Sequence, residues 1–192
     1  MLSAILLAAG ESKRMGEPKQ LMPLGKHTLL EQAIDNLLNS SVDETIVVVG
    51  HKAEEITRAI ATKPVKIMFN PNYRQGMSTS IVAGLILVDP QSQAVMLALG
   101  DQPLVESQTI NQLIDAFNSH DKGIAVPTHR GKRGNPIIFN IKYKAKLLEL
   151  EGDIGGREII RQHPGDVLEV AVDSESVISD IDTKDDYKSQ LG

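Results

Sequence analysis

The sequence predicts an α/β fold in which a mostly parallel sheet lies between two layers of helices, a three-layer α/β/α arrangement. Two observations lead to this prediction. Apolar runs without polar alternation recur along the chain, as in strands that are buried on both faces of a parallel sheet. Segments whose apolar residues repeat at helical spacing separate the first three of these runs. The resulting β-α-β-α-β order favours parallel strands joined by right-handed crossovers.

The first 103 residues carry the clearest alternation of strand and helix patterns. Residues 4–9 form an uninterrupted apolar run. Thr28 and Glu31 then make a capping box, which predicts the start of a helix that ends near Asn39. After it we expect strands at 45–49, 65–69 and 94–99, and helices at 53–61 and 81–88.

The remaining residues predict shorter elements between polar loops. We expect helices at 106–119, at 143–150 and from 157 onward, and strands at 124–127, 137–139 and 167–172. Thr183 suits the N-cap of a last helix. The length fits a single domain that spans residues 1–192.

The composition narrows the classes of function. The formal net charge is −5 and no long basic run occurs, so binding to nucleic acid has little support. The sequence has no cysteine, which excludes disulfides, thiolate metal sites and a cysteine nucleophile, and its five histidines lack metal-ligand spacing. The longest apolar run, residues 81–88, is too short to span a bilayer, and no signal peptide is visible. We expect a soluble, cytoplasmic protein that does not bind membranes.

The stretch after the first strand predicts a binding site for an anion. It contains Gly10 and Gly16 together with the cations Lys13, Arg14 and Lys19. Loops at the carboxyl ends of parallel strands hold ligands in α/β proteins, and glycine lets backbone N–H groups approach a phosphate. The glycine spacing excludes a Walker A loop, and the Gly-x-Gly-x-x-Gly fingerprint of dinucleotide binding is absent. We therefore expect a polyphosphate in another kind of loop, with solvated loop charges as the alternative.

The pattern Leu-Ala-Ala-Gly-x-Ser-x-Arg-Met-Gly-x-Pro-Lys, from Leu7 to Lys19, resembles the signature of GT-A-like nucleotidyltransferases, most closely the molybdenum cofactor cytidylyltransferases. The resemblance implies the Rossmann-like sheet of that fold. A second segment, residues 70–80, resembles the stretch that lines the nucleotide site in these enzymes, although Ser78 or Ser80 also suits ordinary helix capping. The nucleotide contacts that the resemblance implies are Leu7, Ala8, Ala9, Gly10, Arg14, Lys19, Asn70, Gly76, Met77 and Ser78.

A turn at residues 100–103 carries the candidate metal ligand. Its sequence Gly-Asp-Gln-Pro, which places Asp101 after a buried strand, resembles the metal-binding turn of the same family. Mg²⁺ is usually held by one or two carboxylates together with phosphate oxygens and water. Asp182, in the tail, matches the position of a second metal ligand in these enzymes. The alternative for Asp101 is a plain Asp-containing turn. The alternative for the tail is the start of a helix capped by Thr183, directly after Asp182. The resemblance thus implies Mg²⁺ at Asp101 and Asp182, and its candidate catalytic residues are Arg14, Lys19 and Asp101.

Two later stretches resemble the acceptor side of the same enzymes: Arg-Gly-Asn-Pro at 133–136 and Gly-Asp-Ile-Gly-Gly-Arg at 152–157. On local grounds the first is a solvated hairpin loop, and Asp153 in the second is a helix cap. The resemblance implies a nucleotide-binding half, residues 1–103, and an acceptor-binding half, residues 104–192. Its candidate acceptor contacts are Arg133, Gly134, Asn135, Pro136, Asp153 and Arg157.

Together these patterns predict a Mg-dependent nucleotidyltransferase, whose catalysis rests on positioning and charge neutralisation. The resemblance implies CTP as the nucleotide, molybdopterin cofactor as the acceptor and a xanthine-dehydrogenase-type molybdoenzyme as a partner. Relatives with similar loops act on sugar phosphates or other small phosphates, or use GTP, so these substrates stay open. A non-catalytic molybdenum cofactor chaperone is the alternative from another class, and the presence of Lys19 and Asp101 argues against it.

Overall fold

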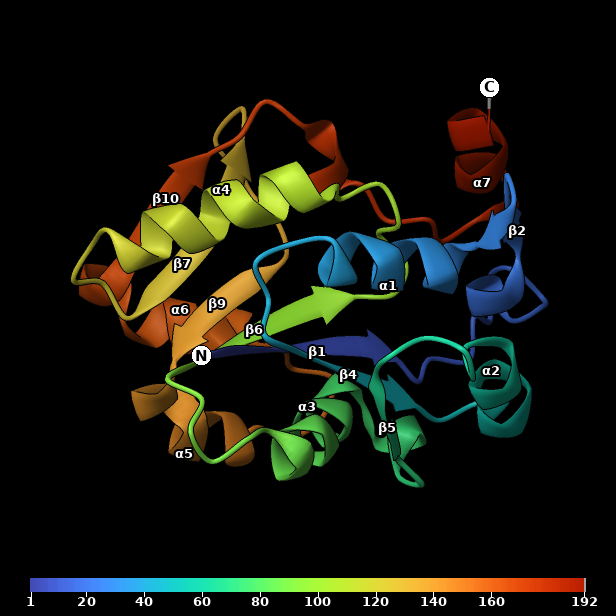
Figure 1. The fold of residues 1–192 in the computed structure, drawn as a ribbon, viewed down its shortest axis with the longest axis horizontal. Helices are drawn as coiled ribbons and strands as arrows, with labels where there is room; N and C mark the ends of the chain where they lie inside the picture. Colours follow the sequence, from blue (N-terminus) through green and yellow to red (C-terminus); the bar gives the residue numbers. More distant parts are fainter. Residues whose placement is uncertain (192) are drawn as a thin grey trace.

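The computed structural model describes residues 1–191 and has a central eight-stranded sheet with helices on both faces (Figure 1). The strand order is β10-β7-β9-β6-β1-β4-β5, with β8 paired to β7. Within residues 1–191 no helix is long and apolar enough to cross a membrane. The strands of this sheet are β1 Leu2–Ala8, β4 Glu44–Val49, β5 Lys66–Phe69, β6 Ala94–Leu99, β7 Ile124–His129, β8 Lys132–Arg133, β9 Ile137–Asn140 and β10 Val167–Ala171. A small separate sheet pairs β2 Pro23–Leu24 with β3 His27–Thr28. The helices are α1 Leu29–Leu38, α2 Ala53–Ala59, α3 Met77–Leu87, α4 Ser107–Asn118, α5 Lys144–Leu148, α6 Arg157–Gln162 and α7 Lys184–Leu191.

The sheet is mostly parallel, as predicted. β1 lies between β4 and β6 and pairs in parallel with both, β4 pairs in parallel with β5, and β10 pairs in parallel with β7. β9 is antiparallel to both of its neighbours, β6 and β7. The connection from β7 to β9, residues 130–136, explains this reversal. A parallel return needs a crossover of about a dozen residues or more, and this connection is shorter.

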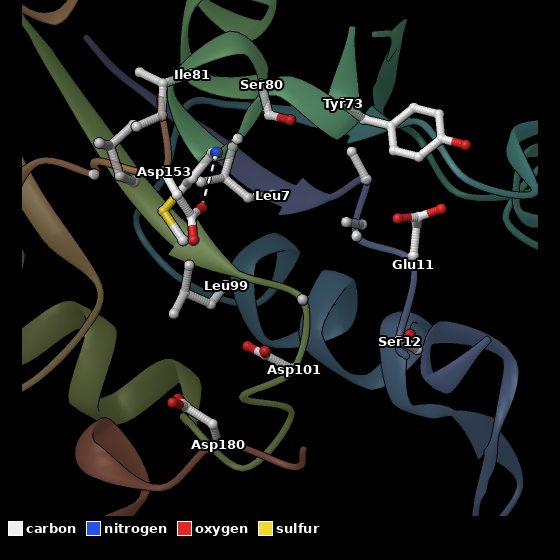
Figure 2. A pocket seen from close by; sticks show the side chains of 18 of the residues that line it. Leu7, Glu11, Ser12, Tyr73, Ser80, Ile81, Leu99, Asp101, Asp153 and Asp180 are labelled. Atoms are coloured by element: carbon white, nitrogen blue, oxygen red, sulfur yellow. Dashed lines mark hydrogen bonds between the residues drawn. The ribbon is translucent and has the colours of Figure 1, made fainter. Parts of the chain in front are cut away.

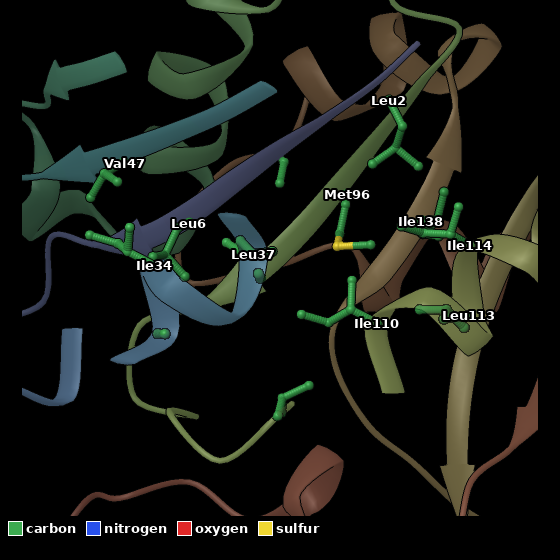
Figure 3. Packing of buried hydrophobic residues seen from close by; sticks show 14 of the residues in the cluster. Leu2, Leu6, Ile34, Leu37, Val47, Met96, Ile110, Leu113, Ile114 and Ile138 are labelled. Carbon is green, nitrogen blue, oxygen red and sulfur yellow. The ribbon is translucent and has the colours of Figure 1, made fainter. Parts of the chain in front are cut away.

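Two apolar cores fill the space between the sheet and its helices, one on each face. On one face Leu6 and Val47 pack with Ile34 of α1 and with α4 (Figure 3). On the other face Ile5 and Ile46 pack with α3, α5 and α6. Successive strand side chains point to opposite faces, and helices cover both faces, so the strands have continuous apolar sequences. The three-layer α/β/α prediction is confirmed.

Helix α3 differs most from its prediction. It begins at Met77 rather than at residue 81, because Gly76, with φ of +113°, serves as the N-cap. The alternative in which Ser78 or Ser80 caps the helix is wrong, since α3 has no side-chain cap and both serines are buried within it. The polar side chains of Ser78, Thr79 and Ser80 are accommodated in the helix because they find partners inside the protein.

Two predicted helix caps, Thr28 and Thr183, are confirmed, whereas the alternative in which Asp153 caps the next helix is wrong, since the N-cap of α6 is Gly156 without a side-chain cap. At the start of α1, Thr28 Oγ1 accepts a hydrogen bond from the Glu31 N–H at 3.2 Å, and Glu31 Oε2 accepts one from the Thr28 N–H at 2.7 Å. At the start of α7, Thr183 Oγ1 accepts a hydrogen bond from the Asp186 N–H at 3.1 Å. Each cap satisfies N–H groups that have no partner within the helix.

A carboxylate near α5 joins three segments of the chain. A 3-10 turn, Ile141–Tyr143, replaces the beginning of the helix predicted at 143–150 and directs two side chains to Asp166. Asp166 Oδ2 accepts a hydrogen bond from the Tyr143 hydroxyl at 2.6 Å and pairs with Lys142 Nζ at 2.7 Å, while Oδ1 accepts the Gly123 N–H at 3.0 Å. The contact with Lys142, followed by that with Tyr143, lowers the pKa of Asp166 from 3.8 to about 2. Burial and the hydrogen bond to Asp166 raise the pKa of Tyr143 to about 12.

We expect Asp166 to make the fold sensitive to acid. A carboxyl group whose pKa is lower in the folded state stabilises the fold above its ordinary pKa, here 3.8, and the contribution is lost as the pH falls toward about 2. Urea titrations at a series of pH values, from neutral down to about 2, measure the effect. Asp166→Asn should lower the free energy of unfolding at neutral pH, and this free energy should then fall less in acid than it does in the wild type. Asp173→Asn, at an exposed carboxylate, is the matched control. Equal acid dependence in the wild type and in Asp166→Asn would contradict the prediction.

Candidate active site

The carboxyl ends of β1 and β6 border a cavity of about 800 Å³. This is the edge of the sheet at which α/β proteins bind ligands, and the volume lies within the range of small-molecule sites. Figure 2 shows carboxylates of Glu11, Asp101 and Asp180 around the cavity, with Leu7 and Leu99 among them. Its charged lining residues are Glu11, Lys13, Arg14, Lys19, Arg74, Asp101, Asp153, Arg157, Asp180 and Asp182. Its aliphatic lining residues include Leu7, Ile81, Leu97, Leu99 and Ile137.

The N-terminal loop is held against the sheet by Gln20, which the sequence analysis did not single out. Gln20 is 3% exposed, and its Nε2 donates hydrogen bonds to the backbone oxygens of Ala8 at 3.2 Å and Gly10 at 3.1 Å. Ser12 Oγ accepts the N–H of Lys19 at 3.1 Å and closes the loop. Buried polar groups need hydrogen-bond partners. A polar residue in a segment that must pack under a loop is therefore the feature of the sequence that could have indicated Gln20. These hydrogen bonds determine the shape of the loop.

The ammonium group of Lys19 lies between two of the predicted aspartates. Lys19 Nζ donates to Asp101 Oδ2 at 2.6 Å and to Asp182 Oδ1 at 2.8 Å. Arg14 Nη2 donates to the other oxygen of Asp182 at 2.6 Å. The side chain of Lys19 is 13% exposed, whereas that of Arg14 is 69% exposed. The fold thus brings together four predicted residues from three separate segments of the chain.

The charges in this cluster stabilise one another. Burial opposes the charge of Lys19, but Asp101 and Asp182 outweigh it, so the pKa of Lys19 is raised above its ordinary value. Burial also opposes the charge of Asp182, but Lys19 and Arg14 outweigh it, so the pKa of Asp182 is lowered. Lys19 and Asp182 are therefore both charged at neutral pH.

Asp180 also lines the cavity, and the sequence analysis assigned it no role. Its Oδ1 accepts a hydrogen bond from Gln102 Nε2 at 2.7 Å. Partial desolvation of its carboxylate, together with the nearby charge of Asp101, raises the pKa of Asp180. The signal that predicts its position is the spacing of Asp180 and Asp182 around Ile181, because alternate residues of an extended segment face the same side. Ile181 is fully buried on the opposite side.

The carboxylates can accommodate a cation. Among the contacts of residues 1–191, the buried Oδ1 of Asp101 has no hydrogen-bond partner, while its Oδ2 pairs with Lys19. Leaving a buried acceptor unsatisfied is costly, so this atom suits a ligand that supplies positive charge. No group of three or more His, Cys, Asp or Glu side chains within the described residues could hold a metal ion by itself. A metal here would depend on Asp101, Asp182 and oxygen atoms of a bound substrate.

Most of the predicted site residues lie on the wall of this one cavity, and a few lie outside it. The predicted residues on the wall are Leu7, Ala8, Ala9, Gly10, Arg14, Lys19, Gly76, Met77, Asp101, Asn135, Asp153, Arg157 and Asp182. The predicted residues that lie outside it are Asn70, Ser78, Arg133, Gly134 and Pro136.

The residues outside the cavity make contacts within the protein. Asn70 is 2% exposed, and its Nδ2 donates a hydrogen bond to Ser80 Oγ at 3.0 Å, so it shapes the segment before α3. Arg133, on the hairpin strand β8, pairs with Glu169 at 2.7 Å. This position agrees with the hairpin alternative for Arg133. A Cβ on Gly134 would overlap the carbonyl group of Val177, so the chain passes too closely there for a side chain.

A second group of cavity residues was not predicted from the sequence. Arg74 Nε pairs with Glu11 Oε1 at 3.2 Å, and the Arg74 guanidinium lies 5.6 Å from the centre of the Tyr73 ring. These residues connect the segment before α3 to the N-terminal loop at the rim of the cavity. Single charged or aromatic loop residues carry no periodic signal, so only the fold reveals this contact.

Known proteins resemble the chain over most of its length. The family described as "MobA-like NTP transferase domain" matches residues 4–167. The molybdenum cofactor cytidylyltransferase of Escherichia coli K12 is 29% identical over 187 residues, which are 97% of this chain and 93% of that protein. The nicotine blue oxidoreductase of Paenarthrobacter nicotinovorans is 28% identical over 95% of this chain and 92% of its own.

Solved structures agree with this assignment. Rv0371c of Mycobacterium tuberculosis H37Rv superposes with a TM-score of 0.89 at 30% identity, over 99% of this chain and 97% of that chain. A manganese complex of the same protein superposes with a TM-score of 0.86 at 29% identity, over the same shares of both chains. The fold, the cavity at the strand ends and the match to residues 4–167 therefore agree. The chain belongs to the family of MobA-like NTP transferase domains and is a nucleotidyltransferase.

Proposed function

We propose that this nucleotidyltransferase is a CTP:molybdopterin cytidylyltransferase, which joins CMP to the terminal phosphate of the molybdenum cofactor and releases pyrophosphate. The observation that carries the proposal is the cluster of Lys19, Asp101 and Asp182 beside the loop at the end of β1. Cations and carboxylates in one cavity suit a triphosphate bound with a metal ion. The alignment with the Escherichia coli enzyme over nearly the full length of both chains supports these substrates.

The reaction requires positioning and charge compensation but no protein nucleophile. An oxygen of the acceptor phosphate attacks the α-phosphorus of CTP and forms a new P–O bond. The bond from the α-phosphorus to the bridging oxygen breaks, and pyrophosphate leaves with its electron pair. Lys19 and Arg14 line the cavity and can donate hydrogen bonds to the phosphates, which offsets the charge of the departing group. Their ion pairs with Asp101 and Asp182 are exchanged or shared when the triphosphate binds.

Asp101 and Asp182 are the residues that would hold Mg²⁺. The buried Oδ1 of Asp101 supplies a ligand atom at no cost in hydrogen bonds among the described residues. When bound, the ion would neutralise charge on the phosphate oxygens. The manganese complex of Rv0371c supports a divalent ion in this family.

On the acceptor side we propose that Arg157 and Asn135 bind the acceptor phosphate, and that Leu97, Leu99 and Ile137 contact its ring system. All five residues line the cavity. Guanidinium groups bind phosphate well, and an aliphatic wall favours a flat apolar surface. In this scheme residues 1–103 serve mainly the nucleotide and residues 104–192 mainly the acceptor, within one domain. A xanthine-dehydrogenase-type enzyme in the cytoplasm would receive the product.

One assay separates this function from its alternatives. Pyrophosphate release is measured with Mg²⁺, each of the four NTPs in turn, and molybdenum cofactor or a sugar phosphate as acceptor. Of the four NTPs, we expect only CTP to give release, and we expect this release to require molybdenum cofactor. Release with GTP or with a sugar phosphate would support nucleotidyl transfer but would show that the proposed nucleotide or acceptor is wrong. Tight binding of molybdenum cofactor without turnover or NTP binding would support the chaperone alternative instead.

Asp101→Asn should abolish most Mg²⁺-dependent turnover. The substitution preserves the shape of the side chain but removes the charge that would hold the ion. Mutation of a residue that only hydrogen-bonds to a metal ligand typically lowers metal affinity or activity by about 10- to 100-fold. For a direct ligand such as Asp101 we expect kcat to fall by more than about 100-fold. Glu106→Gln, at an exposed carboxylate after the same turn, is the control. An undiminished rate in Asp101→Asn would show that Asp101 is not a metal ligand. An unchanged metal requirement in Asp182→Asn would show that Asp182 is not one.

Lys19→Met should lower kcat by about 100-fold or more, because one charged donor to the phosphates is lost. The methionine side chain is similar in length to that of lysine, so the loop should keep its backbone hydrogen bonds. Lys26→Met, at an exposed lysine beyond the loop, is the matched control. Steady-state kinetics with varied CTP measure the effect. Near-native kinetics would mean that Lys19 stabilises the fold and takes no part in the reaction.

A further inference from the structure

The start of α3 meets a segment from the other half of the chain. The Ser78 N–H donates to the carbonyl oxygen of Gly152 at 3.2 Å, and Ser78 Oγ donates to the same oxygen at 2.7 Å. The Met77 N–H donates to Asp153 Oδ1 at 3.2 Å, the dashed contact in Figure 2. Three hydrogen bonds therefore join residues 77–78 to residues 152–153. We refer to these two pairs of residues and their contacts as the α3 junction.

Glycines allow the two backbones to approach each other at the α3 junction. A Cβ on Gly76 would lie 2.6 Å from the Asp153 nitrogen and closer still to the Gly152 carbonyl group. A Cβ on Gly155 would lie 2.9 Å from Met77 Sδ. Real Cβ atoms do not approach backbone atoms so closely, so Gly76 is required by the contact as well as by its φ of +113°.

The hydrogen-bonding groups of Ser78 are used within the α3 junction and are not available to a substrate. Ser78 is 1% exposed, does not line the cavity, and uses both its N–H and its hydroxyl on Gly152. Asp153 lines the cavity but directs one carboxylate oxygen to the Met77 N–H. The first N–H groups of α3, where a phosphate would otherwise bind, are thus bonded to the protein itself.

We propose that Ser78 and Asp153 are positioning residues, which fasten the segment that carries Arg157 to the start of α3. For the ligands on each side, this inference rests on the proposed function. Near the α3 junction the cavity wall includes Gly76 and Met77 on one side and residues 155–157 on the other. A displacement of about 1 Å between reacting groups can cost about 100-fold in rate. The α3 junction therefore determines how the acceptor is placed relative to the nucleotide.

Three variants test the proposal: Ser78→Ala, Asp153→Ala and Asp153→Asn. Hydrogen–deuterium exchange at the Met77 and Ser78 amides is the first readout, and the kcat and KM values are the second. In both alanine variants we expect exchange about fivefold faster, the effect of one lost hydrogen bond. We expect kcat to fall about tenfold or more while KM for CTP stays within about threefold. Asp153→Asn should restore both the protection and the rate, because its amide oxygen accepts the same N–H.

The outcomes separate a positioning role from direct contact with a substrate. If Asp153→Asn protects the amides but loses as much activity as Asp153→Ala, the charge of Asp153 contacts a substrate and the positioning role is overturned. If exchange is unchanged in both alanine variants, the α3 junction does not hold the segments together. Glu151→Ala, at an exposed neighbouring carboxylate, is the control. Asp153 is exposed, so its variants should fold even if Ser78→Ala does not. If the wild type releases no pyrophosphate, the proposed function fails, whereas the exchange measurement still decides the α3 junction.

Discussion

The position of the Lys19 ammonium group is the constraint on which the cavity depends. It joins the loop after β1, the turn after β6 and the C-terminal tail, although Asp101 and Asp182 lie 82 and 163 residues further along the chain. Only 13% of the Lys19 side chain is exposed, so water screens these ion pairs weakly. Removal of one partner from a buried charge pair typically costs about 3–5 kcal/mol. The three segments therefore depend on one another's charge to stay in place.

The sheet accounts for two of these three segments, and a small core accounts for the third. β1 and β6 are neighbours with Leu7 opposite Leu99, so the loop and the turn that follow them begin side by side. The tail forms no strand at this point. Instead the Ile181 N–H donates to the Asp101 carbonyl oxygen at 2.9 Å, and its buried side chain packs with Met15 of the loop. The apolar residue between two aspartates thus directs both carboxylates toward the cavity.

The layers and the loops at the strand ends could be predicted from local patterns in the sequence, whereas the roles of individual loop residues came from the resemblance to a family. Buried strands are continuously apolar, and ligand-binding residues follow them directly. Residues whose role depends on a distant partner could not be predicted in this way. Ser78 suits a ligand or a cap by type, but Gly152, 74 residues away, accepts its hydroxyl. Arg133 suits a phosphate, but Glu169 of β10, 36 residues away, pairs with it. Sequence position alone contains no information on either partner.

The cavity is fastened at two ends by contacts of different kinds. The ion pairs of Lys19 use groups that phosphates and a metal ion would compete for, so in the proposed reaction they exchange at each turnover. Two of the three hydrogen bonds of the α3 junction run to the backbone carbonyl of Gly152 from the N–H and the buried hydroxyl of Ser78, which lies outside the cavity. A site whose charged contacts rearrange needs other contacts that persist, or its two walls would separate when the ion pairs open. The close packing of Gly76 on Gly152 meets this need, because it depends on shape and not on charge.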